Sequence, residues 1–308
     1  MKLTIGTRGS KLALAQVDLV VNFLSNKFPD LRFEKKIIRT TGDNISDAPL
    51  SKIGGKGLFV KEIDEAVVRG EVDFAVHSAK DVPTEMLEDL EIASVPERGD
   101  IGDALISRNG GGIDDLPNGA VVGTSSLRRR AEILNYRSDI QIRDLRGNID
   151  TRLRKLDSQE YDAIIMARAG LKRLGFADRI TEELPLDSFP PSVGQGAIAI
   201  VTRKDSPGKE YITAVNHPES MVRIKTERAL LKSLGGGCQV PIGAVSAVNG
   251  GIILKGVIIS PSGENRIDAA YEGATQDAER IGVEVAKRLL EGGADEILKE
   301  VYGESWSD

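Results

Sequence analysis

Cys238 has the sequence surroundings that most strongly suggest covalent chemistry in this chain. It is the only cysteine among 308 residues, so an internal disulfide is excluded. The pattern from Pro218 to Leu234 predicts a helix, and the glycines at 235–237 end it because glycine accepts the positive φ of a helix C-cap. A thiol that follows three glycines suits a nucleophile or a point of covalent attachment. A small buried side chain is the alternative, because thiolate character decides reactivity.

Two segments combine a strand, hydroxyl residues and arginines at the start of a predicted helix. The first, after a strand at 3–6, contains Arg8 and Ser10. The second follows a strand at 120–123 and contributes Thr124, Ser126, Arg128 and Arg129. Backbone N–H groups at a helix N-terminus bind anions, and an arginine fork matches a carboxylate. The repeat predicts two α/β units that each offer an anion site; capped helices with surface arginines are the alternative.

Lys80 and Asp81 follow a strand at 73–77 whose continuous apolar character is typical of a buried position. In open α/β sheets, ligands bind beyond the carboxyl ends of the strands. We therefore predict a site at Lys80 and Asp81, with a turn aspartate and a surface lysine as the alternative. His77, at the end of the strand, is interpreted as a packed structural histidine.

The segment at 47–57 is rich in glycine and carries Lys52 and Lys56 ahead of Phe59. It lacks the Walker spacing, so it does not indicate a nucleotide site. We interpret it as a mobile loop that brings these three side chains over a cleft; a solvated loop is the alternative. Arg146 and Arg152 follow a strand end and a helix start, where they add positive charge.

Composition excludes several classes of function. The formal net charge is −6, from 41 basic and 47 acidic residues, and aromatic residues make up 4% of the chain. Both values oppose nucleic-acid binding, which needs positive charge and stacking surfaces. One cysteine and two distant histidines give no metal-ligand spacing. A single cysteine, no apolar signal segment and no membrane-length apolar stretch predict a cytoplasmic protein without membrane contact.

The order of the predicted elements indicates three domains. Strand and helix patterns alternate to about residue 196, where a segment with two prolines and two glycines resembles a hinge. We expect a first α/β lobe at 1–98 that the chain rejoins at 197–215, and a second α/β lobe at 99–196. Residues 216–308 form a smaller α+β unit, in which three strands predict an antiparallel sheet with helices on one side.

Five sequence motifs together resemble the porphobilinogen deaminase (hydroxymethylbilane synthase) family. They cover the chain in order and are VHSAKDVP at 76–83, GTSSLRR at 123–129, LRGN at 145–148, VGQG at 193–196 and GGGCQVP at 235–241. The resemblance implies two lobes of the type II periplasmic-binding-protein kind and a third domain. It implies a transferase that joins four porphobilinogen molecules head to tail, with loss of ammonia, into hydroxymethylbilane.

The resemblance also implies a cofactor and a set of site residues. A dipyrromethane would be bound to Cys238 through a thioether, with no metal and with porphobilinogen as the small-molecule partner of a monomer. Asp81, Arg8 and Lys80 would be catalytic. The residues around cofactor and substrate would be Ser10, Ser78, Thr124, Ser126, Arg128, Arg129, Arg146, Arg152, Gln195 and Gly196. Lys52, Lys56 and Phe59 would belong to the flexible loop, and Arg173 is a further candidate.

Two other classes of function compete with the enzyme. A cytosolic solute sensor on the same two-lobed scaffold explains the anion sites, but not Cys238 or a third domain. A nucleic-acid binder that uses the basic segment at 127–155 is opposed by the negative net charge and the few aromatic residues. The mass of the intact protein separates the three, because only the deaminase exceeds its sequence mass by a dipyrromethane.

Overall fold

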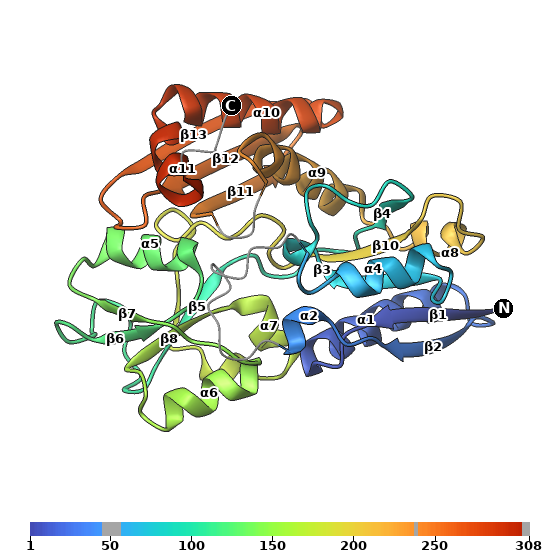
Figure 1. The fold of residues 1–308 in the computed structure, drawn as a ribbon, viewed down its shortest axis with the longest axis horizontal. Coiled ribbons are helices and arrows are strands. Elements are labelled where there is room, and N and C mark those ends of the chain that lie inside the picture. The colour runs from blue at the N-terminus through green and yellow to red at the C-terminus, as the bar shows by residue number, and fades with distance from the viewer. Residues whose placement is uncertain (45–56, 237–239, 304–308) are drawn as a thin grey trace.

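The computed structural model describes residues 1–44, 57–236 and 240–303, which form two α/β lobes and a third unit (Figure 1). The first lobe is built on a five-stranded sheet in the order β2-β1-β3-β10-β4. Its strands are β1 (Lys2–Thr7), β2 (Arg32–Ile37), β3 (Phe74–Ser78), β4 (Leu90–Ser94) and β10 (Ile198–Arg203). Strands β1, β2 and β3 are parallel, whereas β10 is antiparallel to both of its neighbours.

Helices cover both faces of the first sheet. They are α1 (Lys11–Lys27), α2 (Thr41–Asn44), α4 (Lys61–Val68) and α8 (Lys209–Thr213), with a 3-10 turn η1 (Ala79–Asp81) after β3. Val17, Val20 and Leu24 recur at helical spacing and bury one stripe of α1 against β1, β3 and β10. Ile63 and Val67 of α4 pack on the opposite face. The carboxyl ends of β1 and β3 therefore lie at one rigid edge.

The second lobe repeats this architecture with a sheet in the order β7-β6-β8-β5-β9. Its strands are β5 (Asp103–Ser107), β6 (Val121–Gly123), β7 (Gln141–Arg143), β8 (Ala163–Ala167) and β9 (Glu182–Glu183). Its helices are α5 (Leu127–Tyr136), α6 (Ile149–Asp157) and α7 (Arg168–Arg173), followed by the turn η2 (Ala177–Arg179). Ile133 of α5 packs on one face, and Leu153 and Leu156 of α6 pack on the other.

The third unit is an antiparallel sheet in the order β11-β12-β13 with its helices on one side. Its elements are α9 (Pro218–Ser233), β11 (Ile242–Val248), β12 (Ile252–Ile259), β13 (Arg266–Gly273), η3 (Thr275–Asp277), α10 (Ala278–Glu291) and α11 (Ala294–Tyr302). Helices α9 and α10 approach so closely that a Cβ at Gly282 would lie 2.4 Å from the carbonyl oxygen of Thr226. The predicted fold class, two α/β lobes and an antiparallel domain, is confirmed.

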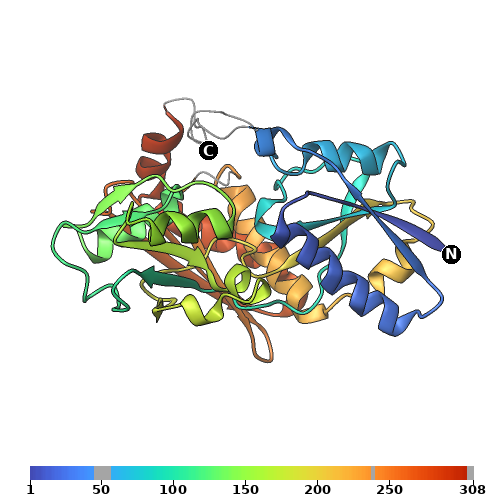
Figure 2. The ribbon, with the colours of Figure 1, turned by 90° about the horizontal axis from the view of Figure 1, so that it is seen from below.

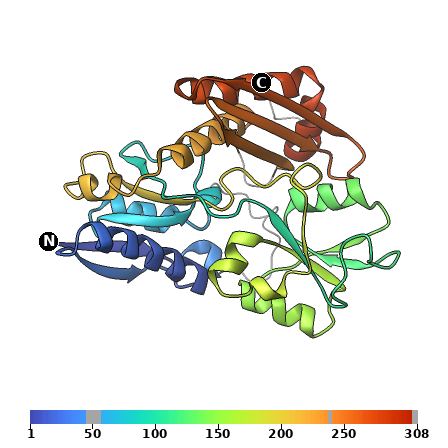
Figure 3. The ribbon, with the colours of Figure 1, turned by 180° about the vertical axis from the view of Figure 1, so that it is seen from behind.

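The three units meet along two crossing segments that join the lobes (Figures 2 and 3). One segment runs from β4 to β5 and the other from β9 to β10. Arg98 of the first segment forms a buried ion pair with Glu227 of α9 at 2.6 Å, and Glu227 also accepts from the backbone N–H of Gly194 in the second. The third unit thus holds both segments. The domain boundaries at residues 98, 196 and 215 stay a prediction.

Candidate active site

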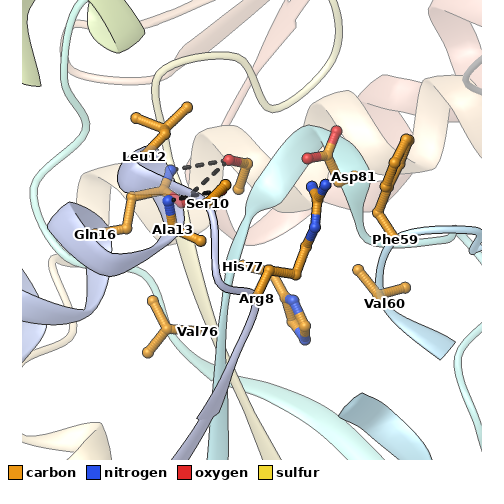
Figure 4. Close-up of a pocket in the computed structure, with 11 residues that line it drawn as sticks. Arg8, Ser10, Leu12, Ala13, Gln16, Phe59, Val60, Val76, His77 and Asp81 are labelled. Carbon is orange, nitrogen blue, oxygen red and sulfur yellow. Dashed lines mark hydrogen bonds between the residues drawn. The ribbon is translucent and has the colours of Figure 1, made fainter. Parts of the chain in front are cut away.

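Asp81 is the last residue of the turn η1, which directly follows the carboxyl end of the buried strand β3. It lines a cavity of about 60 Å³ whose other walls come from β1, α1 and the start of α4 (Figure 4). The side chains around this cavity include Arg8, Ser10, Gln16, Phe59, His77 and Ser78. The structure therefore brings five residues predicted from the sequence, Asp81 included, to one place together with Gln16 and His77. His77 is 4% exposed and lies 3.1 Å from the buried Asp64, as a structural histidine would.

Arg8 follows β1 and extends its guanidinium into the same cavity. Its Cζ lies 4.4 Å from the centre of the Phe59 ring, close enough for a cation–π contact. In Figure 4 the guanidinium points toward the Asp81 carboxylate. Its Nε donates to Asp43 Oδ1 at 3.1 Å, and Nη2 donates to the same oxygen. Sequence reasoning did not find Asp43, which belongs to α2.

Hydroxyl groups complete the first anion site. Ser10 is the N-cap of α1 and accepts a hydrogen bond from the Ala13 N–H at 3.3 Å, as its position predicted. Gln16, one turn further along α1, donates from Nε2 to Ser78 Oγ at 2.8 Å. This bond joins α1 to the end of β3. The first turn of the helix, with its unpaired N–H groups, is thus held beside Asp81 and Ser78.

The second lobe repeats the capped helix start. Ser126 is the N-cap of α5 and accepts from the Arg129 N–H at 3.4 Å. Thr124 is buried, and its Oγ1 accepts from the Ser126 N–H at 3.2 Å. Both predicted hydroxyl residues therefore shape the turn between β6 and α5. That turn has the chemistry of an anion site, because the helix dipole and free N–H groups lie at this end.

Arg128 and Arg129 are buried and share one carboxylate, Asp103. Arg128 Nη2 donates to Asp103 at 2.7 Å, and Arg129 donates to it from Nη2 at 2.7 Å and from Nε at 3.1 Å. Arg128 also pairs with Glu132 at 2.8 Å. Burial raises the pKa of Asp103, but the two guanidinium groups outweigh it and hold that pKa well below its usual value. Both arginines are thus already paired with a carboxylate before any ligand binds.

Lys80 and Gln195 connect the two lobes across the site. Lys80 is half-buried, and its Nζ lies 3.5 Å from Gln195 Oε1. Gln195 is buried and donates from Nε2 to Asp103 Oδ1 at 2.9 Å and to the Ile101 carbonyl at 2.8 Å. Burial, aided by the nearby Arg129 cation, lowers the pKa of Lys80 to about 8. An additional anion bound beside Lys80 would therefore offset the cost of burying its ammonium group.

Arg152 belongs to a group of cations on the second lobe. Its Nε donates to the Gly147 carbonyl at 2.8 Å. Burial, together with repulsion from Arg129 and Arg146, lowers its pKa to about 10. Among the residues that the structure describes, no carboxylate counters this shift. Like charges held together in this way favour an incoming polyanion, because it removes their repulsion.

Gly196 has a structural reason to be glycine. Its φ is +83°, and a Cβ there would lie 2.6 Å from the Asp100 carbonyl oxygen and 2.7 Å from that of Gly99. Its own carbonyl accepts a hydrogen bond from Arg173 Nη2 at 2.6 Å. The two segments between the lobes therefore cross at Gly196 with no room for a side chain. Arg173 is held beside this crossing.

Three predicted site residues, Cys238, Lys52 and Lys56, lie outside the residues that the structure describes. The chain just before Cys238 is described as far as Gly236, whose carbonyl accepts from Thr84 Oγ1 at 3.3 Å. Arg228 of α9 donates to the Val82 carbonyl at 2.9 Å and to that of Pro83 at 2.6 Å. The end of α9 is thus docked on the turn that directly follows Asp81.

Residues 1–44, 57–236 and 240–303 contain no group of three acidic, histidine or cysteine side chains arranged to hold a metal ion. No helix among them is long and apolar enough to cross a bilayer.

The fold and the site together define a two-lobed α/β protein that gathers arginines, hydroxyl groups and the carboxylate of Asp81, a set of groups that suits a ligand rich in carboxyl groups. The chain belongs to the porphobilinogen deaminase family. Residues 3–210 match the family model "Porphobilinogen deaminase, dipyromethane cofactor binding domain", and residues 221–291 match "Porphobilinogen deaminase, C-terminal domain". It is an enzyme of tetrapyrrole biosynthesis, a transferase that acts on porphobilinogen.

Relatives from several bacteria agree with this assignment over nearly the whole chain. The porphobilinogen deaminase of Syntrophobacter fumaroxidans is 49% identical over 300 residues, which cover 97% of each protein. That of Geobacter sulfurreducens is 48% identical and covers 98% of this chain and 95% of the relative. That of Pelotomaculum thermopropionicum is 48% identical and covers 98% of both.

Solved structures resemble the chain less closely. The Bordetella pertussis BvgS VFT2 domain has a TM-score of 0.40 at 15% identity and covers 74% of this chain and 92% of its own. The methionine-binding protein MetQ has a TM-score of 0.43 at 12% identity and covers 70% and 89%.

Proposed function

We propose that this chain condenses four porphobilinogen molecules head to tail into hydroxymethylbilane on a dipyrromethane that Cys238 holds through a thioether. The observation that carries the proposal is the division of charge in the site. Asp81 stands at one cavity with Arg8, whereas on the second lobe Arg152 is repelled by Arg129 and Arg146, and no carboxylate of the described residues counters that repulsion at Arg152. A pyrrole with an acetate and a propionate needs both kinds of group.

The residues of the site fit a bound dipyrromethane. Its carboxylates suit Arg152, Arg146, Lys80 and the helix start at Ser126, because these groups offer charge-assisted hydrogen bonds. When bound, the dipyrromethane supplies the pyrrole to which the first porphobilinogen is joined. The Gly236 carbonyl accepts a hydrogen bond from Thr84, three residues after Asp81. The chain that follows α9 therefore passes close to Asp81 two residues before Cys238. This contact supports attachment at Cys238.

Asp81 would act on the incoming porphobilinogen. The aminomethyl C–N bond breaks with release of ammonia, which leaves a cationic azafulvene, and the new C–C bond forms as the acceptor pyrrole loses a proton. A fixed carboxylate stabilises that cation more than the ground state, because it already points where positive charge develops. Asp81 would also hold pyrrole N–H groups. Arg8 and Ser10 would orient the carboxylates of the substrate.

The mass of the intact protein tests the proposal directly. The protein purified from its host should exceed its sequence mass by one dipyrromethane, and limiting porphobilinogen should add further masses in steps of one pyrrole unit. Hydroxymethylbilane should then appear in solution. A protein that carries the sequence mass alone, and that consumes no porphobilinogen, would contradict the proposal and favour a solute-binding role.

We expect Lys80→Arg to move the alkaline limb of cofactor assembly to higher pH. The Lys80 pKa of about 8 means that its charge is lost as the pH rises through 8, whereas arginine stays charged. Because the pKa of Lys80 is lower in the folded chain than in the unfolded chain, the buried charge costs stability below pH 8. This cost decreases between pH 8 and pH 10.5, so the contribution of Lys80 to the free energy of unfolding rises over that range. The rate at which cofactor-free protein gains its adduct from porphobilinogen measures the limb. An unchanged limb would exclude Lys80 from anion binding.

We expect Arg152→Lys and Arg129→Lys to stall the reaction at different stages. Arg129 is paired with Asp103 near Lys80, so its replacement should impair cofactor assembly. No carboxylate of the described residues counters the repulsion at Arg152, so its replacement should slow later additions. A charge-assisted contact of about 1.5–3 kcal/mol corresponds to roughly 10- to 150-fold. Arg130→Lys, exposed on the same helix as Arg129, is the control. Identical distributions of covalent intermediates in the two variants would contradict the staged assignment.

We further propose a monomer that works in the cytoplasm. The large exposed apolar side chains of the described residues are scattered over separate elements and include Phe23, Leu87 and Val283. Single exposed apolar residues of this kind do not make an interface. Light scattering on the purified protein should give a mass near 33.2 kDa, apart from the bound dipyrromethane.

A further inference from the structure

Asp43 is a carboxylate that the mechanism above does not use, although it contacts Arg8 inside the site. Its Oδ1 accepts from Nε and Nη2 of Arg8. Its Oδ2 accepts from the Thr40 N–H at 3.2 Å and from Thr40 Oγ1 at 2.9 Å. Both oxygens are therefore committed, one to the start of α2 and one to Arg8. The Asp43 side chain is fixed by its own helix before any ligand arrives.

This arrangement decides which edge of Arg8 faces the cavity. Asp43 takes the Nε–Nη2 edge, and the Phe59 ring covers one face of the guanidinium at 4.4 Å. Figure 4 shows the end of the side chain directed toward Asp81. A guanidinium has five N–H donors in a rigid fork, so the donors that Asp43 leaves are aimed across the cavity.

The charge of Asp43 matters as much as its geometry. Arg8 and Asp81 line the same cavity, so without Asp43 the positive charge of the guanidinium would act on Asp81 with no other paired carboxylate to offset it. Asp43 supplies one negative charge against the single positive charge of Arg8. Asp43 and Arg8 are 28% and 22% exposed, so water screens them only in part. The lowered pKa of Asp43, which Arg8 and Thr40 cause against the effect of burial, keeps it ionised.

We propose that Asp43 is a positioning residue for the condensation of porphobilinogen. It holds Arg8 edge-on to the cavity and offsets its charge, so that Arg8 does not weaken the attraction of Asp81 for the cation that forms from the substrate. The proposal rests on the proposed function and extends it to a residue that never touches the substrate. Asparagine cannot replace Asp43, because its amide has one acceptor where Arg8 and Thr40 both donate.

The test compares Asp43→Asn with Glu62→Gln in the full-length holoenzyme. Glu62 anchors the same helix from the other side, since its Oε1 accepts from the Thr41 N–H at 2.8 Å, but no hydrogen bond or ion pair links it to Arg8 among the described residues. We expect Asp43→Asn to lower kcat by about 10- to 100-fold while KM changes by less than about threefold. Glu62→Gln should stay within about twofold of the unmodified enzyme.

Two further variants keep the proposal falsifiable if Asp43→Asn folds poorly. Asp43→Glu retains the charge and should recover part of kcat. In an Arg8→Gln background, adding Asp43→Asn should lower kcat by a further factor of less than about three, because the effect of Asp43 passes through Arg8. Accumulation of covalent intermediates, followed by intact mass, measures such low rates.

The outcomes separate this proposal from the proposed function. Full kcat in Asp43→Asn, an equal loss in Glu62→Gln, or an undiminished effect in the Arg8→Gln background would each overturn the role of Asp43. In all three cases the dipyrromethane adduct and turnover of the unmodified enzyme would leave the proposed function intact. Absence of adduct and turnover in the unmodified enzyme would instead overturn the proposed function, and this role with it.

Discussion

Replacing Cys238 with serine is expected to give a folded protein with no covalent adduct and no turnover. Attachment needs a nucleophile that attacks an electrophilic pyrrole-methylene carbon, and a hydroxyl group at its ordinary pKa is far weaker than a thiolate in this role. Cys238 is the only thiol of the chain, so no other residue can take over. Intact mass and porphobilinogen consumption measure the result.

The matched control for the serine variant is the unmodified protein prepared without cofactor. Both should have the same circular dichroism spectrum, and on addition of porphobilinogen only the unmodified chain should gain mass and begin turnover. Normal turnover by Cys238→Ser without an adduct would refute the attachment role. An adduct on the serine variant would show that the attachment lies elsewhere.

The anion sites were predictable because their signals are local. A strand followed within five residues by a hydroxyl group and an arginine occurs at 3–10 and again at 120–129. The structure places Ser10 and Ser126 as N-caps, each accepting from the N–H three residues later. Cap geometry is a property of a few consecutive residues, and for this reason sequence alone carries it.

The counter-ions were not predictable because they come from distant parts of the chain. Asp103 pairs with arginines 25 and 26 residues away, and Asp43 pairs with an arginine 35 residues away. Sequence reasoning counted the cations and left out the carboxylates that neutralise them. For Asp103 one signal existed. A carboxylate at the head of the apolar strand Ala104–Ser107 is costly to bury unless it is paired.

Strand direction was also beyond the sequence pattern. A run of apolar residues such as β10 indicates a buried strand but not its orientation, and each lobe contains an antiparallel strand inside its sheet, β10 in the first and β5 in the second. The strands β4 and β9 were missed, since one is half polar and the other has two residues. The direction of β10 matters for the site, because antiparallel pairing places Ile198, at the start of β10, opposite Ser78, at the end of β3.

Asp81→Asn is expected to lower turnover by roughly a hundred- to thousand-fold, since an isolated electrostatic contribution of about 3–4 kcal/mol to the transition state would be lost. The amide keeps the size of the carboxylate and removes its charge. Any role of Asp81 in moving a proton from the acceptor pyrrole would add to this loss. Consumption of porphobilinogen under saturating substrate measures it, and intact mass shows whether the substrate is still joined.

The structure makes this loss larger than the removal of a single surface charge. Asp81 shares its cavity with Arg8, so an asparagine there leaves the guanidinium facing the incoming cation with only Asp43 to offset it. The cavity then loses one negative charge and keeps the positive charge of Arg8. Asp89→Asn, an exposed carboxylate beyond the same turn, is the matched control and should stay within about twofold of the unmodified enzyme. Near-normal turnover in Asp81→Asn would reduce Asp81 to a turn residue and transfer the catalytic charge to another group.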